Sequence, residues 1–301
     1  MTNIFPFLRK VKVLIGPVEE WKGGGDPNQA LALYGDGTQD GFRIKFMVNK
    51  FICSTASPSV ISIYNLSQET RNAINKRSVQ IALSVGWSNT DFVLLHTGSL
   101  LQVVSRRQGP DIVTDIITNP SYGGMSRTII SETWSGGVVI KDLVEGLARE
   151  IPGITVDSKK ITIPSSRRTG SQGFSFVGPV NEGLDKLSRV YGFSWGINNK
   201  AFYACSDGMP IGNEKPIISG KDGSLLRAEP MLATPLQKLI GVSIYSLLNP
   251  YVQVGYLVGL DSIMNPTLNG DYFVHSLTHS GDTHSQQYET YIESYVLGAT
   301  D

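Results

Sequence analysis

The stretch NGDYFVHSLTHSGDTHSQQYET, residues 269–290, decides how the rest of the chain is interpreted. Residues 272–279 have the composition of a β-strand, and a second strand begins at residue 288. Gly281-Asp282 separates these strands, and Asn269-Gly270 before them suits a tight hairpin turn. The stretch therefore predicts strands joined by turns in this part of the chain.

Strand signals continue upstream of this stretch. Residues 242–248 and 251–260 have the composition of strands, and Asn249-Pro250 between them fixes a turn. Residues 240–260 carry no charge, but a proline, three glycines and a glutamine interrupt them. A membrane-spanning helix needs about 20 mostly apolar residues without such breaks. We therefore expect strand, turn and strand here, and no stable membrane insertion.

The N-terminal part also follows the period of β-strands. Apolar residues recur with the two-residue spacing of a strand in four segments: residues 44–48, 79–87, 101–103 and 112–116. The last two flank residues 106–110, where Gly109 and Pro110 predict a hairpin turn with Arg106 and Arg107 near its tip. One short helix interrupts the run, with Ser67 as its N-cap.

The period changes in the middle of the chain. Apolar residues recur at steps of three and four over residues 139–151 and 180–191, which predicts two amphipathic helices. Residues 154–156 begin a strand after the first helix. Gly192 ends the second helix, and a hairpin is expected over residues 193–205. Two successive helix–strand units predict a compact α/β insertion between two β-rich segments.

Charge and cysteine content exclude several classes of protein. Lys plus Arg and Asp plus Glu are 26 each, so the basic excess typical of a nucleic-acid-binding protein is absent. The first ten residues lack the long apolar core of a signal peptide. Cys53 and Cys205 lie far apart and form no Cys-x-x-Cys pair. We interpret both as reduced thiols of a protein made in the cytoplasm.

Three histidines provide the strongest hint of chemistry. His275, His279 and His284 lie within ten residues, beside Asp282, and the first two are expected on one face of a strand. A metal or acid–base site is one interpretation, and hydrogen bonding at a turn is the other. The sequence contains neither Gly-x-Ser-x-Gly nor His-Glu-x-x-His. We therefore expect no catalytic, cofactor-binding or metal-binding residues and no cofactor.

Two basic pairs are candidates for contact with a partner. Arg106-Arg107 and Arg167-Arg168 are each expected at a loop tip. Charged residues at such tips are commonly only solvated. The alternative is that they dock onto an acidic surface of a partner.

Two stretches resemble a known family, the central hub protein of the contractile-tail bacteriophage baseplate. Residues 61–67, followed by 70–74, look like a strand of its first β-barrel that leads into a short helix. The C-terminal series is similar to its second barrel. That series consists of Asn249, Pro250, Gly255, Asn269, Gly270, Tyr272, His279, Gly281 and Asp282.

This resemblance implies a mainly β fold with an α/β insertion. Two β-barrel domains would flank or pack on a small α+β domain. The first barrel, with one short helix, would span residues 1–130. The inserted domain, with two helix–strand units, would span residues 131–225, and the second barrel residues 226–301. A barrel leaves no free sheet edge, which suits a component that packs in a ring.

The resemblance further implies a structural subunit without enzymatic activity, located in the virion tail baseplate and assembled in the host cytoplasm. Three copies would form a ring that adapts the sixfold tail tube to the threefold spike. The implied partners are other copies of the chain, the tail spike protein, tail tube or tube-adaptor proteins and the tape measure protein.

Two alternatives stay open. The related tube–spike hub of a tailocin or of a contractile secretion system would show the same resemblance. A hub with a fused cell-wall hydrolase would be an enzyme. The sequence ends soon after the last expected strand, so we expect no room for that hydrolase.

Overall fold

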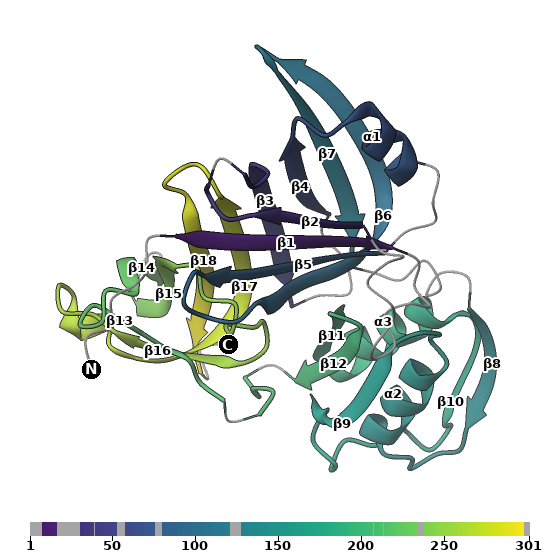
Figure 1. The fold of residues 1–301 in the computed structure, drawn as a ribbon. Helices are drawn as coiled ribbons and strands as arrows, with labels where there is room; N and C mark the ends of the chain where they lie inside the picture. The colour runs from purple at the N-terminus through teal and green to yellow at the C-terminus, as the bar shows by residue number, and fades with distance from the viewer. Residues whose placement is uncertain are drawn as a thin grey trace.

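The structure is a computed structural model that describes residues 8–16, 31–38, 40–52, 58–75, 80–120, 128–206, 208–212, 214–233 and 238–297. Within these ranges the chain is mainly β, as predicted, with α-helices confined to α1, α2 and α3 (Figure 1). Residues 1–7, part of the N-terminal stretch without a signal-peptide core, and Cys53 lie outside the described residues. Cys205 is a buried thiol.

The first β lobe is a strip of antiparallel strands that carries one short helix. Its elements are β1 (Arg9–Gly16), β2 (Leu31–Gly35), β3 (Ile44–Phe51), β4 (Ser59–Tyr64), α1 (Gln68–Asn75), β5 (Gln80–Trp87), β6 (Val93–Gln108) and β7 (Asp111–Asn119). The strand order is β3-β4-β7-β6-β5-β1-β2. The Phe42 N–H, just before β3, donates to the Tyr34 carbonyl of β2 at 2.9 Å. The strip therefore curls back onto its own first strand.

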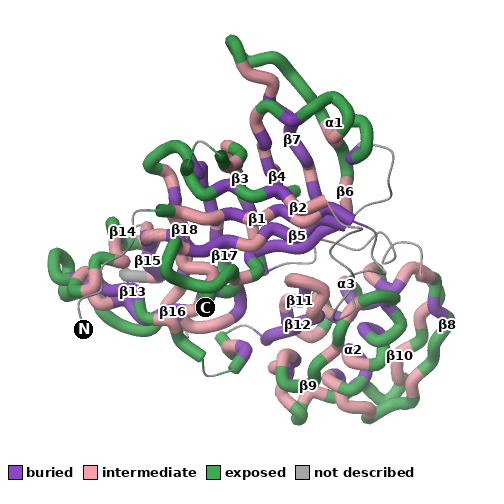
Figure 2. Tube along the Cα trace, in the orientation of Figure 1, coloured by how far each residue is buried: buried purple, intermediate pink, exposed green. Residues whose placement is uncertain are grey.

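Local signals account for two features of this lobe. The Ser67 hydroxyl accepts the Thr70 N–H at 3.1 Å and caps α1, as predicted. Strands β6 and β7 form the predicted hairpin, whose outer half projects from the lobe (Figure 1). Arg106 and Arg107 lie in β6 itself, and the turn consists of Gly109 and Pro110. Figure 2 shows that the tip of this hairpin is exposed.

The second β lobe comes from the C-terminal part of the chain. Its elements are β13 (Ile217–Ser219), β14 (Leu225–Ala233), β15 (Lys238–Leu247), β16 (Leu257–Asp261), the 3-10 turn η2 (Pro266–Leu268), β17 (Gly270–Asp282) and β18 (Tyr288–Val296). Strands β14-β15-β18-β17 form one antiparallel run, and β16 pairs with both β17 and β13. The short turn 220–224 connects β13 to β14.

Strands β3 and β17 join the two lobes. They pair antiparallel from Lys45 opposite Asp282 to Phe51 opposite Ser276. A single sheet therefore runs from β14 in the second lobe to β2 in the first. Figure 1 shows the dark β3 beside the yellow-green β17, although the two are far apart in sequence.

The inserted domain lies below the first lobe in Figure 1. Its elements are β8 (Ile129–Trp134), α2 (Ile140–Arg149), β9 (Thr155–Thr162), β10 (Phe174–Pro179), α3 (Val180–Tyr191), β11 (Phe193–Asn198) and β12 (Ala201–Ser206). Both predicted helices are present. Gly192 ends α3 in the left-handed conformation, at φ +61°, as a helix C-terminus favours. The predicted hairpin is β11–β12, and β9 pairs parallel to β12.

Each of these three parts has its own cluster of buried apolar side chains. The cluster of the inserted domain runs from Ile130 to Ala204. Tyr203, Cys205 and Ile218 pack in the cluster of the second lobe. The division into three domains remains a proposal, and these cores favour a second boundary near residue 206 rather than the expected 225.

Two further expectations concern residues 240–270. No helix among the described residues is long and apolar enough to cross a membrane. The expected tight hairpin turn at Asn269-Gly270 is wrong, because residues 262–269 link β16 to β17 and include η2. The Asn269 side chain stabilises this longer connection: its Oδ1 accepts the Ser262 N–H at 2.6 Å.

Candidate functional site

The resemblance series centres on a turn between β17 and β18, residues 281–287, here called the signature turn. It closes because the Asp282 N–H donates to the Gln287 carbonyl at 2.9 Å. The Asp282 carboxylate also accepts the His284 N–H at 2.9 Å, which is the local bonding that aspartate commonly provides in turns. The sequence therefore encodes the shape of this turn locally.

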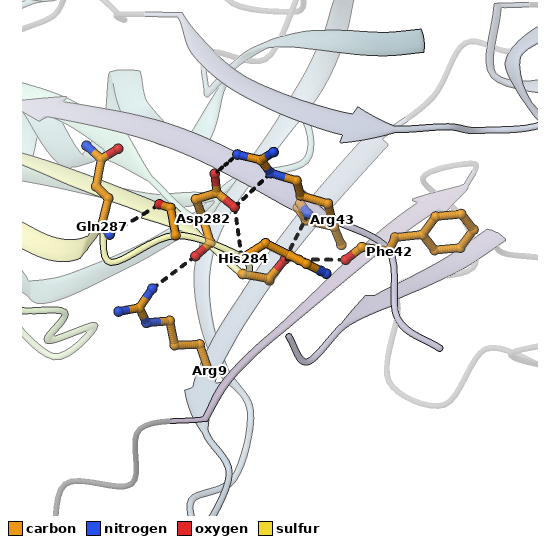
Figure 3. Close-up of polar contacts among 9 residues, drawn as sticks. Arg9, Phe42, Arg43, Asp282, His284 and Gln287 are labelled. Atoms are coloured by element: carbon orange, nitrogen blue, oxygen red, sulfur yellow. Dashed lines mark hydrogen bonds and ion pairs between the residues drawn. The ribbon is translucent and has the colours of Figure 1, made fainter. Parts of the chain in front are cut away.

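The signature turn is bound to the first lobe by two arginines (Figure 3). Arg43, just before β3, donates from Nη2 to Asp282 Oδ2 at 2.7 Å and from Nε to Oδ1 at 3.3 Å. Arg9 at the start of β1 donates to the Asp282 carbonyl at 3.2 Å and to the Gln286 carbonyl at 2.8 Å. One turn of the second lobe is thus held by two arginines that lie more than 230 residues earlier in the chain.

Electrostatics at this contact favour the charged forms of both partners. Burial raises the pKa of Asp282, but the hydrogen bonds from Arg43 and from the His284 N–H outweigh it, so the net pKa lies below the usual range. The hydrogen bond to Asp282 raises the pKa of Arg43 in turn. Asp282 is therefore an ionised structural carboxylate with its oxygens already engaged, which leaves it unsuited to accept a substrate proton.

Thr283 extends the contact through backbone bonds. Its N–H donates to the Ile44 carbonyl, and its Oγ1 accepts the Ile44 N–H, both at 3.1 Å. These two bonds continue the β3–β17 ladder past the last paired residue of β17. The Thr283 hydroxyl thereby accepts the hydrogen bond that a backbone carbonyl would accept in a longer strand.

Packing at the start of β18 completes the joint between the lobes. The buried Tyr288 ring lies edge-on to Phe46 and to Trp87, with ring centroids 6.0 and 4.9 Å apart. Its hydroxyl donates toward the Gly86 carbonyl at 3.0 Å. A Cβ on Gly281 would lie 2.5 Å from the Phe46 ring, so glycine is needed where the two lobes approach each other.

The remaining residues of the series shape the second lobe. Asn249 accepts the Tyr251 N–H at 3.0 Å on its side chain, which makes the turn that Asn249-Pro250 predicted. Gly255 has φ +81°, a conformation that favours glycine. The Tyr272 hydroxyl donates to the Leu268 carbonyl at 2.7 Å, and Gly270 begins β17 beside Asn269.

The three histidines do not form one site. The expectation that His275 and His279 share a face is wrong, because a β-bulge between Val274 and Ser276 shifts the register. His275 is exposed and packs edge-on against Tyr295, whereas His279 is fully buried. Among the described residues, no three His, Cys, Asp or Glu side chains are placed to hold a metal.

The basic pairs have mainly internal contacts. Arg106 forms an ion pair with Asp115 across the β6–β7 hairpin, and the exposed Arg107 donates to the Gly109 carbonyl at 3.2 Å. The Arg167 guanidinium donates to the Gly192 carbonyl at the end of α3 and to Ser206 Oγ. Arg168 donates to the Gly137 carbonyl at 2.9 Å. The internal hydrogen bonds of Arg167 give its guanidinium a structural role that needs no partner protein.

Sequence reasoning missed Arg9 and Arg43 as partners of the signature turn. The Arg43–Asp282 contact spans 239 residues, and no local pattern marks it. The one available signal was the position of Arg43 beside the predicted strand 44–48, and Arg9 had none.

The comparisons with known proteins match both lobes and the insertion. A family model described as baseplate hub gp41 matches residues 31–294. The chain belongs to this baseplate hub family. The matched region includes the signature turn, both arms of the β3–β17 pairing and the whole inserted domain. No curated protein sequence matches the chain.

Solved structures share the hub fold at low sequence identity. A tail protein from Neisseria meningitidis MC58 is 10% identical, with a TM-score of 0.61 and coverage of 96% of this chain and 97% of the other. The 43 kDa tail protein of prophage MuSo2 from Shewanella oneidensis is 10% identical, with a TM-score of 0.56 and coverage of 95% and 96%.

A third similar structure comes from a secretion system. It is the E. coli c3393 protein, described as a component of the type VI secretion system with structural similarity to the T4 bacteriophage tail proteins gp27 and gp5. It is 10% identical, with a TM-score of 0.57 and coverage of 84% of this chain and 73% of the other. These likenesses concern the fold.

Proposed function

We propose that the protein is a structural baseplate hub subunit of a phage tail that adapts the sixfold tail tube to the threefold spike. The observation that carries this proposal is the family match over residues 31–294, which spans two β lobes joined by one sheet. Three subunits with two lobes each offer six similar positions to the tube and three equivalent positions to the spike. Such a ring has heterologous interfaces, in which unlike faces meet.

An apolar patch on the second lobe supports association with another copy of the chain. Leu226, Ile263 and Met264 are exposed large apolar side chains. They border a groove of about 300 Å³ beside β14, which is an edge strand of the sheet. Contiguous exposed apolar surface commonly marks a protein–protein interface. Stable ring interfaces typically bury more than about 2,000 Å² in total, so this patch would be one part of a larger contact.

The other proposed partners are the tail spike protein, tail tube or tube-adaptor proteins and the tape measure protein. The projecting β6–β7 hairpin presents Arg106 and Arg107 near its exposed tip. Arg168 is likewise exposed on the inserted domain. We assign these three arginines to docking on acidic partner surfaces. Charge reversal at Arg107 should then slow assembly in a salt-dependent manner.

A reconstruction of the intact tail tip tests the proposal. Three copies on the central axis, between tube and spike, are expected. Six copies, or a position on the outer baseplate, would contradict the hub assignment. The same reconstruction distinguishes a phage tail from the second candidate, a tailocin or contractile secretion system, which the type VI component among the similar folds favours.

We also infer that the protein acts without enzymatic activity. The Asp282 carboxylate is fully engaged by Arg43 and by backbone, and His279 is buried away from solvent. Purified protein incubated with peptidoglycan should release no soluble fragments. Reproducible release that His279→Ala abolishes would contradict this inference.

A further inference from the structure

A belt of buried polar side chains crosses the sheet where the two lobes meet. It consists of Ser59, His96, Thr118, His279 and Thr290, none more than 2% exposed. His96 Nε2 lies 2.8 Å from Thr118 Oγ1, and that hydroxyl donates to the Ser59 carbonyl at 3.3 Å. Burying so many polar groups is costly unless each has a hydrogen-bond partner.

Two atoms of this belt, Ser59 Oγ and His279 Nε2, have no hydrogen-bond partner among the described residues. His279 Nδ1 lies 2.9 Å from Thr290 Oγ1, but the buried Nε2 has no hydrogen bond within the described part of the chain. Thr290 Oγ1 also accepts the Asn249 N–H, and His279 Nδ1 is the acceptor within hydrogen-bond distance of its own proton. We therefore assign the imidazole proton to Nε2. His279 then presents a buried N–H donor without an acceptor among the described residues.

Lys50 faces the same interior. In β3 it lies two residues beyond Val48, which is paired with His279 of β17, so Lys50 and His279 lie on one face of the sheet. The ammonium is close enough for its charge to contribute, after burial, to the lowered pKa values of both His96 and His279. The Lys50 ammonium, the neutral His96 imidazole and the unpaired His279 Nε2–H thus lie in the same part of the interior.

No acidic group compensates this cation within the described residues. None of the ion pairs found there includes Lys50. Burial lowers the pKa of Lys50 to about 8, without an opposing effect from a carboxylate. A half-buried ammonium without a counter-ion is unfavourable, and an anion beside it would remove that cost.

We propose that Lys50 and His279 form a binding site for a small anion of the size of formate or chloride. The Lys50 ammonium supplies the charge, and His279 Nε2–H supplies a directional hydrogen bond. His96, held by Thr118, forms the neutral wall of the site. The bound anion ties β3 to β17, the strand pair that joins the two lobes.

The site has a defined pH dependence. The titratable groups on which the Lys50 charge acts are His96 on β6 and His279 on β17, and burial, followed by that charge, lowers the pKa of both. They stay neutral near pH 7. Of these three groups, Lys50 is the one that changes charge as the pH rises through about 8, and the anion binds its charged form. Binding is therefore full below about pH 7 and is lost as the pH rises past about 8.

Thermal unfolding with chosen anions tests the proposal. At constant ionic strength and pH 7, replacing bulky gluconate by about 100 mM formate or chloride should raise the Tm of the wild type by about 3 °C, in a saturable way. Lys50→Met should fold, because it removes a poorly solvated charge, and its Tm should not respond. The matched control is Lys45→Met, an exposed lysine on the same strand, which should respond like the wild type.

A second measurement does not depend on any variant. Formate should shift the His279 Nε2–H resonance of the wild type at pH 7, and the shift should disappear at pH 9.5. Equal Tm responses in wild type and Lys50→Met would overturn the proposal. So would a wild type that responds identically to formate and gluconate with an unmoved His279 resonance.

Discussion

The inserted domain and the signature turn are stabilised in opposite ways. The core of the inserted domain comes from one continuous segment, between Ile130 and Ala204. The signature turn instead depends on Arg9 and Arg43, which belong to the far end of the chain. Local contacts cost little loop-closure entropy, whereas contacts across more than 200 residues need the rest of the fold to be in place. We infer that the inserted domain can loosen alone, whereas damage at the turn loosens both lobes.

The largest expected effect is in the core of the inserted domain. Leu187 on α3 is fully buried, so Leu187→Ala should lower the free energy of unfolding of this domain by about 2–5 kcal/mol. Hydrogen exchange should accelerate over residues 128–206 and stay unchanged in β17. The exposed Val190 on the same helix is the control, and Val190→Ala should have little effect. Faster exchange in β17 would break the distinction between the two regions.

The next effect concerns the joint between the lobes. Gly281→Ala places a methyl group 2.5 Å from the Phe46 ring and 2.8 Å from the Tyr288 ring, so we expect a loss of about 1–3 kcal/mol in urea unfolding. Exchange should accelerate in β1, β5 and β18 together. Gly146→Ala in α2 is the matched control, because nothing lies within 4 Å of its Cβ, and it should be neutral or stabilising. A change confined to β18 would contradict the coupling.

Titration of Asp282 gives a smaller effect with a defined sign. Its folded pKa is depressed, so its contribution is present above the unfolded pKa of about 3.9 and is lost as the pH falls through the folded value. Asp282→Asn should cost about 1 kcal/mol at pH 7, because the Arg43 side chain is partly exposed and screened. Urea midpoints of variant and wild type should converge as the pH falls below the folded pKa of Asp282. The control is Asp40→Asn, at an exposed site, which should leave the urea midpoint at pH 7 unchanged.

The smallest effect is on the surface of the inserted domain. Glu145 accepts a hydrogen bond from Arg149 one helical turn later in α2. Glu145→Gln should cost less than about 0.5 kcal/mol, since helical pairs at this spacing are weak and the Arg149 side chain is well exposed. In 1 M salt the difference should vanish. A larger loss of unfolding free energy would mean that surface ion pairs of α2, and not only the buried Leu187, stabilise this domain.

The contrast between the regions also explains what the sequence could predict. The helices around Leu143 and Leu187 were predictable, because their apolar spacing is written in one segment. Turns at Asn249-Pro250 and Gly192 were predictable for the same local reason. The resemblance identified the signature residues, including Asp282, before any partner was known.

Most of the missed features depend on pairing with another strand. The bulge that separates His275 from His279 arises where β17 pairs with β18, and no residue type in the strand marks it. Asn269 forms a side-chain bond to Ser262 instead of a hairpin turn, because the chain between β16 and β17 is longer than its turn signal suggested. Nothing in the sequence distinguishes Lys50 from other lysines in strands. Only the pairing of β3 with β17 places it on the same face as His279.

The pairing of β3 with β17 sets the order in which parts of the polypeptide can fold during synthesis. A ribosome adds about 5–20 residues per second, so the 239 residues between Arg43 and Asp282 take roughly 12–48 s to synthesise. The inserted domain has all of its core within that interval and can fold meanwhile. The edge of β3 that faces β17 cannot pair during this interval, because β17 has not yet left the ribosome. An unpaired edge is a template for strands of other nascent chains, and it stays open until β17 has been made.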